Sequence, residues 1–327
     1  MKHWIQAALA AAVIGAAVPA QAETISVTLQ LPETHYLAKN WEDFGKIISE
    51  KSGGDLNIQL FPSAQLFKDN QVPEAVGSGA ITAGSASLSR YAGAVPAVTI
   101  ISVPFLLDTE EKLRAAVAPG SDLRKLLDDS ILKETNNRVL WWQGYGRNIF
   151  VSNGGGLTTP DAFKGKKIRS YGTVQGWTAE ALGGAPTLIS GSEQFLAYQQ
   201  GTVDIGMTGT SGVEERRLYE AMDTLTLTND GAIEFIAVIN NDFFEGLSEE
   251  NQKIVLDAAA EVEASLRDFV IADEDAAVAR LREKMTVVEL TDEQRDAFRE
   301  ATKGVIDRFL ESAGDAGQAA LDAVNKL

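Results

Sequence analysis

Apolar and polar residues alternate or recur with helical spacing along most of the chain. Residues 23–31 (ETISVTLQL) alternate, which predicts a strand, and 55–61 (DLNIQLF) predict a second strand. Between them, 36–51 place Trp41 and Phe44 on one face of a helix. A strand, a helix and a strand in this order predict a βαβ unit with parallel strands.

The next residues continue the alternation of helices and strands. We predict helices over 69–78 and 110–127, and strands over 81–87 and 138–144. Residues 98–107 (VTIISVPFLL) are apolar, and we predict a strand that ends in a turn, because the internal proline cannot donate to a sheet.

A second α/β region starts near Tyr145, and its elements are again short. The predicted strands are 148–152, 166–171 and 203–207, and the predicted helices are 174–182 and 192–200. Extended crossings are predicted at 225–230 and 232–240. A long helix starts at 248 and keeps its helical character to about 285, and a short strand follows at 287–290. Thr291 and Gln294 have capping-box spacing and begin a helix that continues to 312.

Two α/β regions joined by late return crossings predict a hinged, two-lobed clamshell with the ligand site in the cleft. The fold class expected is α/β, with a mixed sheet flanked by helices in each lobe, hinge strands between the lobes and a long helix joining them. We expect 23–145 plus 234–272 to form lobe I, and 146–233 plus 273–327 to form lobe II.

The first residues predict export. An uncharged apolar run, 5–18, precedes a small-x-small cleavage signal at 20–22. The run is shorter than the ~20 apolar residues that span a bilayer. We therefore expect a signal peptide over 1–22 rather than a membrane anchor, a periplasmic location, and no membrane insertion of the mature chain.

Composition narrows the function classes. The formal net charge is −17, which disfavours binding to nucleic acid and to anionic membranes. There is no cysteine, which excludes disulfides, thiol catalysis, cysteine metal sites and a lipid anchor on cysteine.

Catalytic motifs are absent. His35 is the one histidine after the signal peptide, and neither a P-loop nor a G-x-S-x-G elbow occurs. The glycine run 154–156 is interpreted as a flexible turn rather than a phosphate cradle. Acidic pairs such as Glu214-Glu215 are typical of solvated faces, although a pair of glycosidase acids stays open. We expect no catalytic residue, no cofactor and no metal site.

Two arginines stand out among the few basic residues. Arg169 ends the predicted strand KKIRSY, and Arg147 lies where the second region begins. A guanidinium can hold a carboxylate with two parallel hydrogen bonds. From the residues alone, ordinary surface or structural pairing is the favoured interpretation for each.

Specific motifs run through the second region. Residues 160–206 read PDAFKGKKIRSYGTVQGWTAEALGGAPTLISGSEQFLAYQQGTVDIG, and FPSAQL (61–66), LTLTND (225–230) and LSEENQKIV (247–255) flank them. In this order the motifs resemble the solute-binding subunits of tripartite ATP-independent periplasmic (TRAP) transporters, over nearly the whole mature chain. The resemblance implies two α/β lobes, a hinge and a long spanning helix.

The resemblance also implies a ligand and candidate residues. It implies a small organic acid whose carboxylate is clamped by Arg169 of the KIR motif, with assistance from Arg147. Met207 and Thr208 stand where family members often carry an acid and an amide in the cleft. Ser85 stands where a sialic-acid-type member carries an acid, which argues against sialic acid.

Two aromatic residues follow the KIR motif. Tyr171 and Trp177 could form an apolar wall of the site or plain core. The expected function is periplasmic capture of a carboxylate by a monomer that delivers it to TRAP permease subunits. A secreted hydrolase and a binding protein for a sensor kinase are the alternatives.

Overall fold

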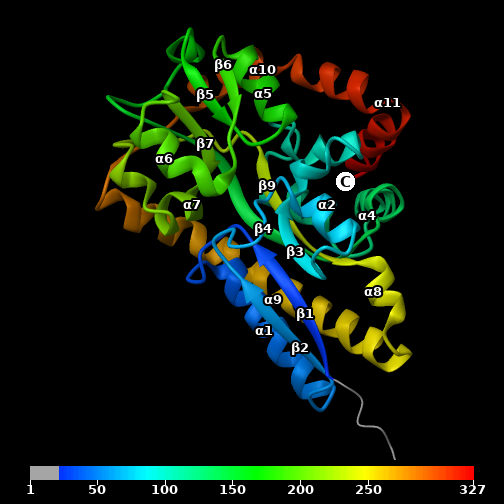
Figure 1. The fold of residues 1–327 in the computed structure, drawn as a ribbon. Coiled ribbons are helices and arrows are strands. Elements are labelled where there is room, and N and C mark those ends of the chain that lie inside the picture. Colours follow the sequence, from blue (N-terminus) through cyan, green and yellow to red (C-terminus); the bar gives the residue numbers. More distant parts are fainter. Residues whose placement is uncertain (1–21) are drawn as a thin grey trace, which may run out of the picture.

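The computed structural model describes residues 22–327, so residues 1–21 of the expected signal peptide lie outside the described residues. The first lobe is built on strands in the order β2-β1-β3-β9-β4 (Figure 1). β1 is parallel to β2 and β3, and β9 is antiparallel to β3 and β4. This confirms the predicted βαβ unit. The bounds are β1 Glu23–Leu29, α1 Tyr36–Lys51, β2 Leu56–Phe61, α2 Val72–Gly77, β3 Ala83–Ser87, α3 Glu110–Val117 and α4 Asp122–Thr135.

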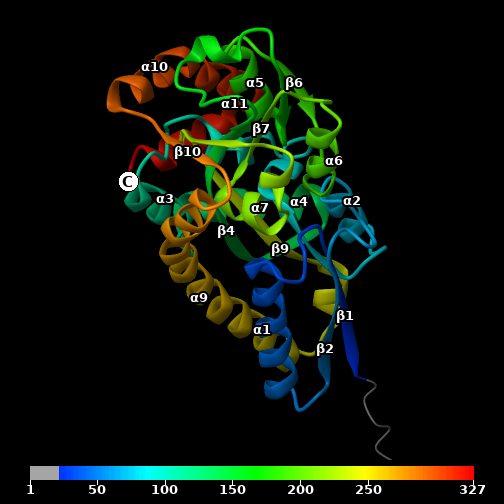
Figure 2. The same ribbon diagram turned by 90° about the vertical axis from the view of Figure 1, so that its left-hand side faces the viewer.

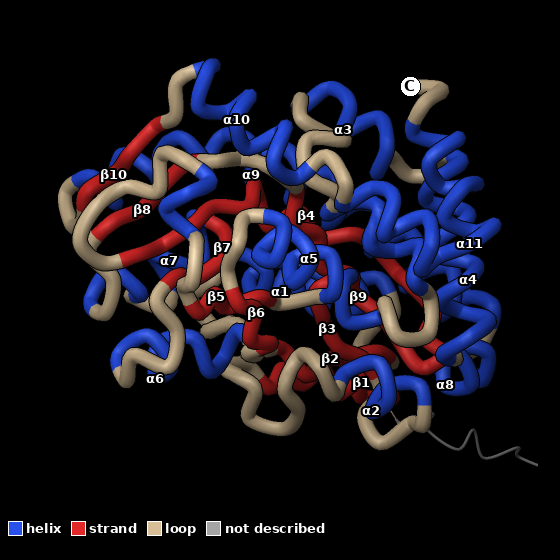
Figure 3. The backbone as a smooth tube through the Cα atoms, turned by 90° about the horizontal axis from the view of Figure 1, so that it is seen from above, coloured by secondary structure: helices blue, strands red, loops and turns tan. Residues whose placement is uncertain are grey.

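The second lobe repeats the mixed arrangement. β7 pairs in parallel with β5 and antiparallel with β4, β6 lies beyond β5, and β8 joins β4 to β10. In the view from above, β5 and β7 lie in the middle of the molecule and β8 and β10 at its left-hand edge (Figure 3). The bounds are β5 Lys167–Ser170, α5 Thr173–Ala181, β6 Ala185–Leu188, α6 Gln194–Gln199, β7 Ile205–Gly209, α7 Thr210–Glu215, β8 Thr224–Leu227 and β10 Thr286–Glu289.

Two long strands connect the lobes. β4 (Asn137–Ser152) is one continuous strand where the sequence predicted two, and β9 (Ala232–Asn240) runs antiparallel to its first part. The pairing register shifts between Gly144 and Gly146, and Gly146 has a φ of 110°. Glycine adopts this φ without strain, so the strand continues through an irregularity that a two-strand interpretation treated as a break.

Helix α9 (Glu249–Arg282) joins both lobes, as predicted. Its 34 residues extend about 50 Å. It packs against α1 in the first lobe and against α7 and β10 in the second (Figure 2). Ser248 begins the helix, because its side chain accepts a hydrogen bond from the N–H of Asn251. α8 (Asn241–Gly246) lies between β9 and this helix.

The C-terminal helices differ in part from the prediction. The capping box of Thr291 and Gln294 is confirmed, but α10 (Asp292–Thr302) ends early and α11 (Val305–Val324) follows it. α11 packs against α5 of the second lobe and against α4 and the 3-10 helix at 96–102 of the first. The residue boundaries of the lobes stay a prediction.

The strand predicted over 98–107 is wrong. Pro96–Ser102 form a 3-10 helix with proline in its first turn, and turns follow. Val98, Ile100 and Ile101 are all buried, because this segment lies inside the core of the first lobe. An apolar run that is buried on every side has no period from which strand and helix could be told apart.

Candidate functional site

A small, partly open cavity lies where the two lobes meet the connecting strands. The first lobe contributes Gln30, Asp69 and Ser87, and the connecting strands contribute Tyr145, Ile233 and Phe235. The second lobe contributes Arg169, Tyr171, Gly191, Gln194, Thr208 and Arg216. The cavity is therefore lined from both lobes at once.

The strand directions place these residues. Gln30 directly follows β1, and Ser87 is the last residue of β3. In the second lobe, Tyr171 follows β5 and Thr208 lies next to the end of β7. In α/β sheets, ligands bind beyond the carboxyl ends of the strands, and here those ends of both lobes face the same cavity.

Arg169 is held by backbone carbonyls. Its Nε donates to the carbonyl of Ile189 at 3.0 Å, and its Nη1 donates to the carbonyl of Met207. The guanidinium lies over the Tyr171 ring, 5.2 Å from the ring centroid. Nη2 donates to no residue within 22–327, although the side chain is almost wholly buried. Arg169 is thus oriented by the fold with one end available to a ligand.

Arg216 approaches the same cavity from the C-terminal end of α7. Its Nη2 donates to Gln30 Oε1 at 3.2 Å, whereas Nε and Nη1 are buried without a hydrogen-bond partner among the described residues. Gly191 makes this position possible, because a Cβ there would lie 2.5 Å from Nη1 of Arg216. A second cation with free donors therefore borders the cavity.

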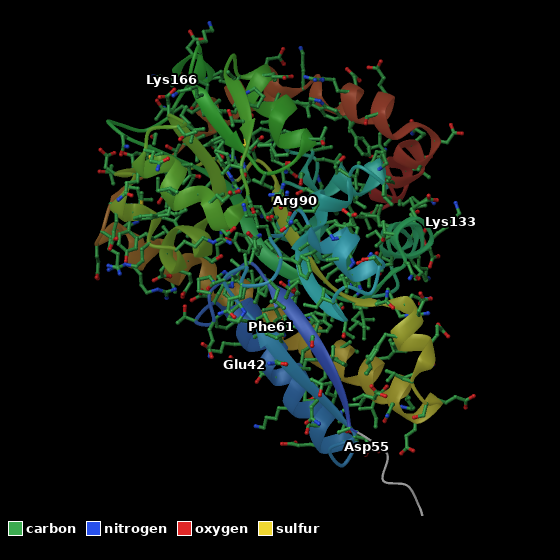
Figure 4. The ribbon with its side chains drawn as sticks, viewed as in Figure 1. Glu42, Asp55, Phe61, Arg90, Lys133 and Lys166 are labelled. Carbon is green, nitrogen blue, oxygen red and sulfur yellow. The ribbon has the colours of Figure 1, made fainter. Side chains whose placement is uncertain are left out.

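Asp69 is the one carboxylate in the cavity lining, and it is already occupied. Arg90 Nε donates to Asp69 Oδ2 at 2.7 Å, and both side chains are buried. Gln30 Nε2 donates to the same oxygen at 3.2 Å, and Ser190 Oγ bonds the other oxygen. In Figure 4, Arg90 lies in the middle of the molecule, whereas Lys133 and Lys166 lie at its edges. The charges of Arg90 and Asp69 therefore offset each other.

The cavity therefore carries uncompensated positive charge inside an acidic protein. Neither Arg169 nor Arg216 forms a salt bridge within residues 22–327. Burial lowers the pKa of Arg169 and the charges of Arg90 and Arg216 act in the same direction, whereas Tyr198 and Asp69 act against it. Arginine still keeps its charge in proteins, so the site selects for an anion.

Neutral hydroxyls complete the lining. Burial raises the pKa of Tyr171 well above its ordinary value, and the charge of Asp230 adds to this effect. Tyr171 OH donates to Asn148 Oδ1 at 3.1 Å, while Thr208 is buried beside it in β7. These groups offer hydrogen bonds and apolar contact without opposing the charge of the arginines.

Hydrogen bonds close the lobes around the cavity. Ser89 Oγ in the first lobe donates to the carbonyl of Tyr171 in the second at 3.2 Å. Further contacts across the cleft are Thr34–Glu215 at 2.6 Å and Lys68–Glu193 at 2.7 Å. The structure is therefore a closed arrangement, in which residues of both lobes can contact one small molecule.

The family model for bacterial extracellular solute-binding proteins, family 7 (DctP), matches residues 28–313. The chain belongs to this family. Family 7 comprises solute-binding proteins of the TRAP type rather than enzymes, so the hydrolase alternative is not retained.

Curated family 7 relatives share about a quarter of their residues with the chain. The C4-dicarboxylate-binding periplasmic protein DctP of Rhodobacter capsulatus is 26% identical over 94% of this chain and 92% of its own length. The 2,3-diketo-L-gulonate-binding periplasmic protein YiaO of Escherichia coli is 27% identical over 84% and 82%. The ectoine-binding periplasmic protein TeaA of Halomonas elongata is 26% identical over 83% and 81%.

Solved structures share the fold of this family 7 chain. A TRAP solute-binding protein from Sulfurospirillum deleyianum with bound succinate has a TM-score of 0.86 and 24% identity, over 92% of this chain and 98% of the other. The sugar acid binding protein DctPAm from Advenella mimigardefordensis, in complex with galactonate, has a TM-score of 0.87 and 24% identity, over 94% and 99%. The two-lobed α/β fold expected from the sequence is thereby confirmed.

The candidate residues of the family 7 resemblance separate into two groups. Arg169, Tyr171 and Thr208 all line the cavity. Met207 does not, since its side chain is fully buried in the core and only its carbonyl meets Arg169. Trp177 also lies outside the lining, where the guanidinium of Arg308 covers its ring, 4.9 Å from the centroid.

Arg147 and Ser85 lie outside the cavity lining as well. Arg147 Nη1 donates to the carbonyl of Leu107 at 2.6 Å, and its backbone N–H donates to Glu274 at 2.9 Å. Ser85 accepts a hydrogen bond from Trp41 Nε1 at 2.7 Å and bonds Gln143, deep in the first lobe. Protein groups already use the polar atoms of both side chains.

The sequence did not point to several lining residues. Asp69 and Gln194 are polar residues in ordinary turns or helices, and Gln30 reads as the exposed side of a strand. A signal did exist for Gln30 and Ser87, since residues at the carboxyl ends of parallel strands gather at one edge. Arg216 stands in the charged run EERR, which is typical of a solvated face.

Two further results concern the described residues. Within 22–327, no cluster of His, Asp and Glu has the arrangement of a metal site. Over the same residues, no helix combines the length and apolar character that crossing a membrane requires. In the glycine run 154–156, the N–H of Gly154 donates to the carboxylate of Asp223 at 3.1 Å, so that loop serves an internal contact.

Proposed function

We propose that this protein is the periplasmic receptor of a TRAP transporter, that it captures a small organic acid through Arg169, and that it delivers the acid to the membrane permease subunits. The observation that carries the proposal is a cavity in which two guanidinium groups lack an acidic partner among the described residues. A buried cation without a counter-charge is costly, and a bound carboxylate supplies that charge.

The geometry suits Arg169 as the carboxylate clamp. Two carbonyls, of Ile189 and Met207, fix the guanidinium plane, so little side-chain entropy remains to be lost on binding. The free Nη2 can then donate to a ligand oxygen in the fixed plane, with a charge-assisted bond. Thr208, which lines the same cavity, is the proposed neutral hydrogen-bond partner of the bound acid, and the Tyr171 ring is the proposed apolar wall.

Closure couples binding to delivery. Gln30 and Asp69 reach the cavity from the first lobe, whereas Arg169 and Arg216 reach it from the second. Both sets of contacts exist together only when the lobes are closed, so the ligand favours the closed state by its differential affinity. The closed form is then the one that docks on the permease.

The family relationships support this assignment. C4-dicarboxylate and 2,3-diketo-L-gulonate are the ligands named for two relatives, and succinate and galactonate are bound in two similar structures. The relatives are described as periplasmic, which supports the proposed location. A sensor kinase as the downstream partner is the alternative, and reconstituted transport with the permease subunits would distinguish the two.

Titration calorimetry with a panel of organic acids tests the proposal. Arg169→Lys is expected to weaken binding of the cognate acid by about 2–5 kcal/mol, because an ammonium lacks the planar guanidinium that donates to both carbonyls and still aims Nη2 at the ligand. Arg147→Lys is the matched comparison: it is a buried arginine of the same region, but it is satisfied by Leu107 outside the cavity, and it is expected to retain affinity. Unchanged affinity in folded Arg169→Lys would contradict the clamp.

A further inference from the structure

Arg216 is oriented by an unusual local backbone. It is the residue at which α7 ends, and the next residue, Arg217, adopts a left-handed conformation with φ 53°. The turn sends two consecutive arginines in different directions. The Arg217 side chain is 67% exposed and pairs with Glu220, whereas Arg216 extends to the cavity.

The guanidinium of Arg216 is fixed but not satisfied. Gln30 Oε1 accepts from Nη2, and the other amide end of Gln30 donates to Asp69. Nε and Nη1 remain buried without partners in the described part of the chain. Leaving buried donors unsatisfied costs free energy, more so when they are charged. Charged donors without protein acceptors suit a site that receives acceptor oxygens from a bound anion.

The two arginines are separate anchors on one cavity. Arg169 is fixed by carbonyls of its own lobe, and Arg216 by Gln30 from the opposite lobe. Each has donors to spare, and the single lining carboxylate, Asp69, is neutralised by Arg90. Two positive charges are therefore available to a ligand, and one carboxylate would balance only one of them.

We propose that Arg216 is a second anion-binding residue and that it selects for short acids with two anionic groups, one on Arg169 and one on Arg216. This inference rests on the proposed function, because it assumes that Arg169 holds the first carboxylate. Arg169 and Arg216 line the same small cavity, which suits a chain of few carbons. A zwitterion finds no free carboxylate for its cationic group in this lining.

Matched pairs of acids test the proposal by calorimetry. Succinate and butyrate have the same carbon chain, as have glutarate and pentanoate, and each pair differs in the second carboxylate. The wild-type protein is expected to prefer the diacid of each pair. Arg216→Gln is expected to weaken diacid binding about 10- to 150-fold, as for loss of a charge-assisted hydrogen bond, and to leave the monoacids nearly unchanged.

Arg217→Gln is the control. It removes the same charge from the neighbouring residue, whose side chain faces solvent. It is expected to bind all four acids as the wild type does. Arg216→Lys keeps the charge and is expected to recover part of the diacid preference, which guards against a folding artefact in Arg216→Gln.

The outcomes separate the two proposals. Equal wild-type affinity for the members of a pair, equal weakening of both by Arg216→Gln, or binding of none of the four probes would overturn the role of Arg216. If a wider panel then reveals another acid whose binding needs Arg169, the proposed function stands without the second anchor. If diacids bind and Arg169→Lys changes nothing, the Arg169 clamp fails instead.

Discussion

Buried arginines have different surroundings beside helix α9 and in the cavity. Beside α9, Arg124 Nη1 lies 2.5 Å from Glu263 Oε1, and Arg267 Nη1 lies 2.6 Å from Glu234 Oε1. In the cavity, Arg169 and Arg216 bond only to uncharged oxygens within the described residues. The fold thus gives the arginines beside α9 a carboxylate partner and gives those in the cavity none within the described residues.

The difference distinguishes a structural cation from a binding one. Burial alone does not, since Arg124 and Arg169 are both less than a tenth exposed. Desolvation is costly for each, and at α9 the protein itself offsets that cost with carboxylates. In the cavity the offset must come from outside the chain. A buried arginine that binds a ligand is therefore recognised by its unused N–H donors and by its lack of an acidic partner.

The largest expected effect is on the paired region. Arg124→Met is expected to lower the free energy of unfolding by about 3–5 kcal/mol, because it leaves the buried Glu263 carboxylate without its partner. Urea denaturation of ligand-free protein measures this. Arg169→Met, which removes a cation with no acidic partner, is expected to cost less. Equal losses for the two variants would contradict the distinction between the regions.

A pH effect should report the burial of His35 close to the charge of Arg216. Burial, and then the charge of Arg216, holds the pKa of His35 well below its usual range. The unfolded chain therefore binds a proton near pH 6.5 that the folded chain refuses, so stability is complete above that pH and falls below it.

The measurement compares the wild type with His35→Asn. The side chain of His35 accepts the N–H of Leu37 at the start of α1, and asparagine can cap a helix in the same way. Below pH 6.5 the wild type is expected to lose up to ~1.4 kcal/mol per pH unit more than the variant. Denaturation curves at pH 7.5 and 5.5 give the change in the free energy of unfolding with pH. An equal change in both proteins would show that His35 does not cause the loss of stability.

The smallest expected effect lies at the rim of the cleft. Lys68 Nζ and Glu193 Oε1 are 2.7 Å apart across the lobes, but both side chains are nearly half exposed. Solvent screens such pairs, so a double-mutant cycle with Lys68→Met and Glu193→Gln is expected to give a coupling of about 0–1 kcal/mol. A coupling of several kcal/mol would mean that the rim, and not only the cavity, holds the lobes closed.

Much of the fold could be predicted because local signals agreed with tertiary structure. α1 has the predicted limits, and the capping box of α10 forms as its sequence indicates. The segment 98–107 failed because it is buried on all sides, and β6 was missed because its four residues are mostly exposed and carry no pattern. Periodicity reports one-sided burial, and neither segment has it.

The candidate site was only partly predictable, for a related reason. Arg169 was found through the motif around it, yet motif position says nothing about which atoms stay free. Ser85 matches a cleft position of the family, but the indole of Trp41 and the amide of Gln143 use its hydroxyl. Arg216 and Arg217 are identical in sequence terms, and one left-handed residue decides which of them reaches the cavity.

The central strand of the first lobe has a consequence for when this protein can fold. β3 has β9 as its neighbour, with Ser85 opposite Ala237, so the lobe that begins the chain is completed by a strand that follows β5, β6, β7 and β8 of the second lobe in the sequence. Contacts so distant in sequence form slowly, since a long loop must close first. The N-terminal lobe therefore cannot finish its sheet until residues 232–240 have been made. Ligand binding becomes possible only after this last crossing strand is in place, because Ile233 and Phe235 of β9 line the cavity.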